Sequence, residues 1–157
     1  MVFQFGQFRI DVDAEKTRKF YRDTSRTLTE GCGCILCQNF LAAYETLDPQ
    51  IRQFFDSLGV NICKAADMTS MHGDQKRNIL YYEGFCHLCG KISAGGMEGH
   101  KTLLKTAEYP VAAGCTVAFS TRCALVEKSF PAPVLQLEVR LEVPWVMGGN
   151  FTDVLKW

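Results

Sequence analysis

The strict alternation of residues between Val134 and Val143 constrains the fold more than any other feature of this chain. Apolar residues occupy the odd positions and polar residues the even positions between them: Leu135, Leu137, Val139, Leu141 and Val143 against Gln136, Glu138, Arg140 and Glu142. Because successive side chains of a strand point to opposite faces, this segment predicts a strand with one buried and one solvated face. A sheet with one solvated face is usually antiparallel, so the pattern indicates an antiparallel sheet.

A hairpin is predicted in the middle of the chain. The apolar segments Met68–Met71 and Ile79–Ile92 flank a polar, glycine-containing stretch at 72–78, as the two strands of a hairpin flank their turn. The even positions of the second strand form a credible core face: Leu80, Tyr82, Cys86, Leu88 and Ile92. On that face Cys86 acts as a small hydrophobic residue.

Three further segments carry weaker signals. Residues 2–12 alternate with one slip at Gly6-Gln7, which predicts a half-buried strand with a bulge. Mostly apolar odd positions predict a strand over Cys115–Val126, with Cys115 and Cys123 on its inner face. The glycine-rich residues 93–100 predict a flexible loop.

Helices are predicted between the first strand and the hairpin. Asp13 is a suitable N-cap for a short helix that ends near Asp23. Apolar residues recur at helical spacing over Cys34–Leu47. Asp48-Pro49 then starts another helix, and Gly59 ends it. The inner face of that helix follows the i, i+3, i+4, i+7 pattern: Ile51, Phe54, Phe55 and Leu58.

The order of these elements (strand, helices, strands) predicts the α+β class, with a single antiparallel sheet and about three helices packed on one face. A chain of 157 residues, 47% of them apolar, has the size and the core of one domain that spans 1–157.

Charge and hydropathy restrict the partners and the location. Lys and Arg together number 17, equal to Asp and Glu together, whereas a nucleic-acid-binding protein usually carries a basic excess. No apolar run reaches the roughly 18 residues of a membrane span, and the N-terminal residues lack the pattern of a signal peptide. We therefore expect a cytoplasmic protein without nucleic-acid or membrane partners.

Cys32, Cys34 and Cys37 form the most informative cluster among the eight cysteines. A chain with a core and without an export signal is expected to keep reduced thiols or to use them as metal ligands. Gly31 and Gly33 allow a tight loop there, and thiolates are favoured where a helix begins. Three interpretations remain open: inert thiols, a metal site completed by a histidine (His72, His87 or His100), and a redox pair of Cys34 and Cys37.

A second Cys-x-x-Cys pair, Cys86 and Cys89, raises the possibility of a four-ligand zinc site together with Cys34 and Cys37. In a continuous strand, however, positions 86 and 89 point to opposite faces and cannot bind one ion. The zinc hypothesis with Cys86, His87 or Cys89 as further ligands therefore requires the strand to break at Cys86.

The chain resembles a group of uncharacterised bacterial proteins over most of its length. The resemblance is carried by the segments Glu30–Phe40 and Pro133–Glu138 with Pro144-Trp145-Val146. The resemblance implies a bacterial cytoplasmic setting and no particular activity. In that group the segment that matches Tyr82–Ile92 is an uninterrupted strand that usually lacks a cysteine pair. The resemblance thus argues against an essential role of Cys86 and Cys89.

Signatures of common catalytic sites are missing from the sequence, including Gly-x-Ser-x-Gly, phosphate-binding glycine loops and His-Glu-x-x-His. We therefore interpret the chain as a small binding or regulatory module for a protein partner and not as an enzyme. The alternatives are a thiol–disulfide redox protein that uses Cys34 and Cys37, and a zinc-binding domain. The oligomeric state stays open.

Overall fold

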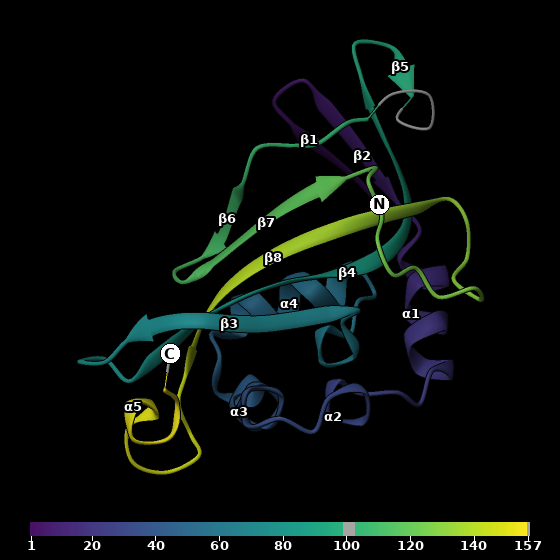
Figure 1. The fold of residues 1–157 in the computed structure, drawn as a ribbon. Helices are drawn as coiled ribbons and strands as arrows, with labels where there is room; N and C mark the ends of the chain where they lie inside the picture. The colour runs from purple at the N-terminus through teal and green to yellow at the C-terminus, as the bar shows by residue number, and fades with distance from the viewer. Residues whose placement is uncertain (99–102, 157) are drawn as a thin grey trace.

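The computed structural model describes residues 1–98 and 103–156, which form a curled antiparallel sheet with helices on one side (Figure 1). The strands are β1 (Val2–Phe5), β2 (Phe8–Val12), β3 (Asp67–Asp74), β4 (Ile79–Ala94), β5 (Met97–Glu98), β6 (Tyr109–Ala112), β7 (Cys115–Ser120) and β8 (Val134–Pro144). The helices are α1 (Ala14–Asp23), α2 (Leu28–Gly31), α3 (Ile35–Ala43), α4 (Pro49–Ser57) and α5 (Phe151–Val154), with 3-10 turns at Tyr44–Thr46 and Ile62–Lys64. The predicted α+β class is confirmed.

The sheet is larger and more curled than the sequence predicts. Its strand order is β1-β2-β4-β8-β7-β6, and β3 and β5 also pair with β4. Phe5 of β1 contacts Tyr109 of β6 and Phe119 of β7, with ring centroids 4.8 and 5.5 Å apart. Aromatic side chains from the two ends of the strand order therefore touch. The sheet is curled strongly enough to resemble half a barrel. Alternation along one strand shows which face is buried but not which strands become neighbours.

The first predicted strand is a hairpin. Phe5 pairs with Phe8, so Gly6 and Gln7 form a two-residue turn between β1 and β2. Gly6 has a φ of 56°, a left-handed value that favours glycine in such turns. The prediction of one bulged strand is wrong, because a chain reversal shifts the phase of alternation just as a bulge does.

Two other strand boundaries also differ from the prediction. β4 continues to Ala94 and turns at Gly95 and Gly96 into β5, so residues 93–98 of the predicted loop belong to a short hairpin. The rest of that loop, with His100, lies outside the described residues. β7 ends at Ser120, and Cys123 therefore lies beyond the strand on which the alternation placed it.

The predicted helix starts are confirmed in atomic detail. The Asp13 carboxylate accepts a hydrogen bond from the backbone N–H of Lys16 (3.0 Å), and the Asp48 carboxylate accepts one from Gln50 (2.8 Å). Gly59 ends α4 with a φ of 74°. A Cβ atom at Gly59 would lie 2.2 Å from the carbonyl oxygen of Ala14. The absence of a side chain at this position thus permits α1 to pack directly on the end of α4.

Side chains of α1 take the place of a strand beside β4. On this edge β3 pairs with β4 up to Phe85, and β2 pairs with it from Gly90 onwards. Between them, the Tyr21 hydroxyl donates to the carbonyl of His87 (2.8 Å) and accepts from its N–H (3.2 Å). The Thr17 hydroxyl accepts from the N–H of Cys89 (2.9 Å). The backbone groups of a buried strand edge are thereby satisfied without a neighbouring strand.

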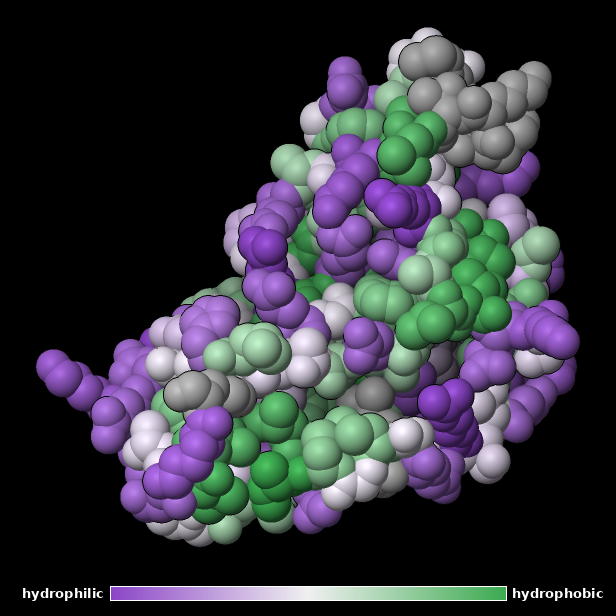
Figure 2. All heavy atoms as spheres, in the orientation of Figure 1, coloured by the Kyte–Doolittle hydropathy of each residue, from purple (hydrophilic) through white to green (hydrophobic). Residues whose placement is uncertain are grey.

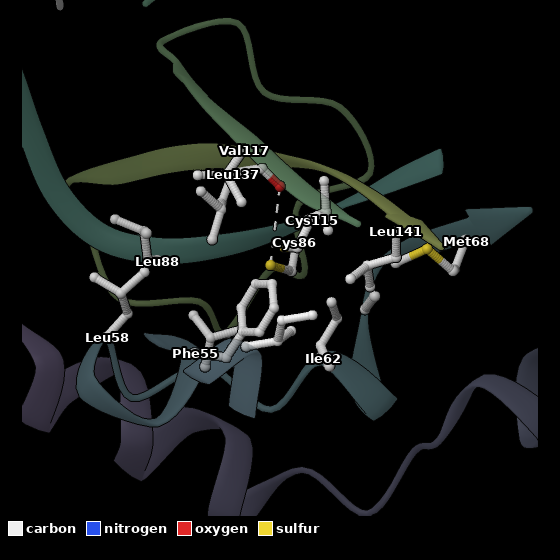
Figure 3. Close-up of a cluster of buried hydrophobic side chains, with 14 of the residues drawn as sticks. Phe55, Leu58, Ile62, Met68, Cys86, Leu88, Cys115, Val117, Leu137 and Leu141 are labelled. Atoms are coloured by element: carbon white, nitrogen blue, oxygen red, sulfur yellow. Dashed lines mark hydrogen bonds between the residues drawn. The ribbon is translucent and has the colours of Figure 1, made fainter. Parts of the chain in front are cut away.

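The hydrophobic core lies between the sheet and α4 (Figure 3). Phe55 of α4 and Leu58 at its C-cap are fully buried against the inner face of the sheet. The Cys86 sulfur lies 3.9 Å from the carbonyl oxygen of Leu137, which it meets across the β4–β8 pair. The even face predicted for the second hairpin strand is confirmed as core, and β4 does not break at Cys86. None of the described helices is long and apolar enough to cross a membrane.

Candidate metal centre

The sulfur atoms of Cys32, Cys34 and Cys37 all lie within 4.8 Å of one another. Cys32 follows the end of α2, Cys34 occupies the N-cap position of α3, and Cys37 lies in the first turn of that helix. Cys32 and Cys34 are exposed, whereas Cys37 is 6% exposed. Within the described part of the chain, this is the one group of three or more possible metal ligands that comes together.

Local hydrogen bonds hold the loop between α2 and α3. The Thr27 N–H donates to the Glu30 carboxylate at the start of α2 (2.9 Å), and the Gln38 side chain donates to the carbonyl of Gly33 (2.8 Å). Gly31 and Gly33 are not among the glycines with positive φ. The backbone freedom expected of them is therefore not used, although a Cβ at Gly31 would lie 2.7 Å from the guanidinium of Arg26.

The thiols of Cys34 and Cys37 differ in acidity. Burial raises the pKa of Cys34, but hydrogen bonds to its sulfur outweigh this effect and lower that pKa below 9.0. The hydrogen bonds come from the backbone N–H of Cys37, the thiols of Cys32 and Cys37, and the N–H of Leu36. Burial, aided by the neighbouring Cys34, raises the pKa of Cys37 to about 12. Negative charge is thus concentrated on Cys34, where the helix dipole also favours it.

This donor set suits a thiophilic metal ion. In a tetrahedral site with Zn–S bonds of about 2.3 Å, the sulfur atoms lie roughly 3.8 Å apart. The three sulfurs, all within 4.8 Å of one another, need only small side-chain adjustments to reach that spacing. They occupy three corners of the tetrahedron, so the fourth ligand has to come from elsewhere.

The other sequence candidates lie outside this cluster. Cys86 is fully buried in the core, and burial raises the pKa of its thiol to about 12. The Cys89 sulfur faces the carbonyl of Ala132 at 3.6 Å, and His87 is 3% exposed. His72 lies exposed on β3. The structure therefore brings together Cys32, Cys34 and Cys37 but none of these as a fourth ligand.

The remaining cysteines occupy packed positions. Cys115 is buried on β7, as predicted, and burial raises the pKa of its thiol to about 12. The sulfur of Cys123 lies 3.6 Å from the Thr121 carbonyl and 3.7 Å from that of Val134.

Asn39 and Tyr82 support the cluster from inside, a role that the sequence did not reveal for either residue. The Tyr82 hydroxyl donates to the carbonyl of Leu36 in the first turn of α3 (2.7 Å). The Asn39 amide donates to Tyr82 (3.4 Å) and to Pro144 (3.2 Å), and its oxygen accepts from the Val146 N–H (2.8 Å). Only the burial of Asn39, at 0% exposure, identifies it, because a fully buried amide requires partners.

Comparisons of the chain with known protein families, with curated proteins and with solved structures found no match. The interpretation of the cluster accordingly depends on its own geometry and chemistry.

Proposed function

We propose that this protein is a small zinc-binding module, in which the thiolates of Cys32, Cys34 and Cys37 hold the ion. The convergence of the three sulfur atoms within 4.8 Å at the start of a helix carries the proposal. Thiolates are preferred zinc ligands, and the lowered pKa of Cys34 supplies one of them near neutral pH. Because the ion must displace a proton from Cys37, the affinity is expected to rise with pH.

We further propose that the module serves a regulatory role by binding a protein partner in the bacterial cytoplasm. The exposure of Cys32 and Cys34 leaves the open coordination position accessible to a ligand from such a partner. Figure 2 shows apolar side chains gathered on the surface over α3 and α5, where Val146, Met147 and Val154 are exposed. The balanced charge argues against a nucleic-acid partner, and the sequence resemblance supports the bacterial setting.

Elemental analysis of protein purified under reducing conditions tests this proposal. We expect roughly one zinc ion per chain in the wild type, and loss of that zinc in the triple variant Cys32→Ser, Cys34→Ser, Cys37→Ser. Cys123→Ser is the matched control, because a serine hydroxyl can donate to the same carbonyls of Thr121 and Val134. Zinc retained in the triple variant, or missing from the wild type after growth with added zinc, would contradict the proposal.

The unequal acidity of Cys34 and Cys37 favours one second function, thiol–disulfide exchange. The Cys34 thiolate would attack a substrate disulfide, form a mixed disulfide and release one substrate thiolate. The Cys37 thiol would then lose its proton, attack the Cys34 sulfur and release the second thiolate. The substrate disulfide is reduced, and the cysteine pair is oxidised.

Mass spectrometry after equilibration in glutathione buffers distinguishes this function from zinc binding. A redox pair shows a Cys34–Cys37 disulfide that forms and disappears over the range of potentials of thiol oxidoreductases. The absence of that disulfide in metal-free wild-type protein would exclude the redox function and leave the zinc proposal intact.

A further inference from the structure

The connection between β7 and β8 closes a cavity over the end of α1. In Figure 1 this connection, coloured green, runs down beside α1. It meets α1 through Phe20 and Phe130, whose ring centroids are 4.4 Å apart. The cavity has a volume of about 270 Å³ and is further walled by the residues that precede β3. It is separate from the cysteine cluster, none of whose residues lines it.

His87 lines this cavity with an incompletely satisfied imidazole. The side chain is 3% exposed, and its Nε2 atom is buried without a hydrogen-bond partner among residues 1–98 and 103–156. The ring lies between Phe85 and Phe130, with centroids 5.8 Å from each. Tyr21 holds the backbone of His87 by two hydrogen bonds, so the position of the strand at this residue is fixed. A buried polar atom without a partner is rare in folded proteins, and a bound ligand is one way to satisfy it.

The state of the imidazole indicates which group the ligand presents. Burial lowers the pKa of His87, while the Ala124 carbonyl acts on the ring as an acceptor and raises that pKa to a lesser extent. The neutral ring therefore directs its N–H towards Ala124. Nε2 then carries a lone pair and accepts a hydrogen bond. The complementary ligand group is a hydroxyl or another neutral donor.

The remaining walls select a flat, anionic molecule. The aromatic side chains of Phe20, Tyr21 and Phe130 offer ring surfaces for stacking. The described lining residues include two cations, Arg26 and Lys64, against a single acid, Glu127. The Lys64 ammonium donates to the carbonyls of Tyr21 (2.7 Å) and Thr24, which leaves one of its three N–H donors for a ligand. Glu127 lies 3.4 Å from Arg26 in an exposed ion pair, which an incoming carboxylate can displace at little cost.

The mouth of the cavity has a strained backbone. Leu125 adopts a φ of 54° although it has a side chain, and that side chain is 70% exposed. Such conformations concentrate at ligand-binding segments.

Taken together, the buried Nε2 atom of His87, the aromatic walls and the two cations point to a ligand site, and we propose that this cavity binds a small hydroxylated aromatic carboxylate. The hydroxyl donates to His87, the ring packs on the outer surface of the Phe20–Phe130 pair, and the carboxylate pairs with Arg26 and Lys64.

Calorimetric titration with 4-hydroxybenzoate, benzoate and 4-hydroxybenzyl alcohol tests the assignment of each group. We expect the first probe to bind most tightly, and the loss of either the hydroxyl or the carboxylate to weaken binding about tenfold. His87→Phe keeps an aromatic ring in place and removes the acceptor, so 4-hydroxybenzoate and benzoate should bind to it equally. Arg26→Gln should abolish the preference for the carboxylate, whereas Arg22→Gln, an exposed position on α1 outside the cavity, should change neither preference.

The outcomes are decisive in both directions. No saturable binding of any probe to the wild-type protein would overturn the proposal, as would an undiminished hydroxyl preference in His87→Phe. Circular dichroism checks the fold of each variant. If His87→Phe does not fold, the His87 ring resonances of the wild type provide the second measurement: they must shift more at saturation with 4-hydroxybenzoate than at saturation with benzoate, which lacks the donor, and equal shifts would overturn the proposal.

Discussion

Cys34 and Cys37 lie within one helical turn of each other, yet their environments favour opposite protonation states. Cys34 is exposed at the N-cap position, where backbone N–H groups lower its pKa. Cys37 faces inward, and its burial raises the pKa to about 12. The difference arises because the turn places one thiol beside the free N–H groups of the helix and the other against the core.

This asymmetry predicts the order in which the thiols react. In reduced, metal-free protein, iodoacetamide should modify Cys34 well before Cys37, with a half-maximal rate below pH 9.0 because the pKa of Cys34 is lowered from that value. Mass spectrometry of the peptides over a pH series measures both rates. Buried Cys86 and Cys115 serve as internal controls that should react only in denaturant. Equal rates for Cys34 and Cys37 would contradict the acidity described above.

The helices depend on close contacts with other elements that their own sequences do not predict. α1 satisfies the open edge of β4 through Tyr21 and Thr17, and it also packs on the end of α4 at Gly59. Gly59 has two constraints, a left-handed φ and a carbonyl oxygen where its Cβ would be. Gly33 has neither constraint, since no atom of the described residues, its two chain neighbours aside, lies within 4 Å of its Cβ position.

Gly59 and Gly33 form a matched pair for testing how closely α1 packs on α4. Gly59→Ala should lower the free energy of unfolding by at least 1–2 kcal/mol, roughly the cost of a side chain at left-handed φ, with the steric conflict added to it. Gly33→Ala should leave stability within about 0.5 kcal/mol of the wild type and retain zinc. Urea denaturation measures both. Equal losses in the two variants would show that the α1–α4 contact is not as close as described.

At the scale of the whole molecule, β4 joins nearly every part of the fold. It pairs with β2, β3, β5 and β8, and it contributes Cys86 and Leu88 to the core on one side and His87 to the cavity on the other. A buried, neutral histidine in so central a strand couples the protonation of one residue to the stability of the entire domain.

The coupling has a definite direction. Burial lowers the pKa of folded His87 below 6.5, so the unfolded chain binds more protons than the folded chain once the pH falls below 6.5. Stability from this group is complete above that pH and decreases as the pH falls towards the folded pKa, by no more than about 1.4 kcal/mol per pH unit. Urea midpoints at pH 7.5 and 5.5 should differ more in the wild type than in His87→Phe. His72→Gln, at an exposed position, should behave like the wild type, and an unchanged difference in His87→Phe would refute the coupling.

The sequence by itself determined the class of the fold and the composition of the cysteine cluster. Alternation over 134–143 and helical spacing over 49–59 report which side chains are buried, and the confirmed N-caps at Asp13 and Asp48 depend on contacts only two or three residues away. Cys32, Cys34 and Cys37 are likewise so close along the chain that local structure is enough to gather them.

Only the tertiary structure decided the curl of the sheet, the turn at Gly6-Gln7, the partners of Asn39 and the cavity at His87. Phe5 contacts Tyr109, and Tyr21 forms a hydrogen bond with the backbone of His87, although both pairs are far apart in the sequence. Cys123 lies beyond β7, and the prediction that placed it on the strand was wrong because periodicity does not reveal where strand pairing stops. The physical reason is the same in each case: a local pattern shows how a residue prefers to be buried, whereas its partner depends on how distant segments pack.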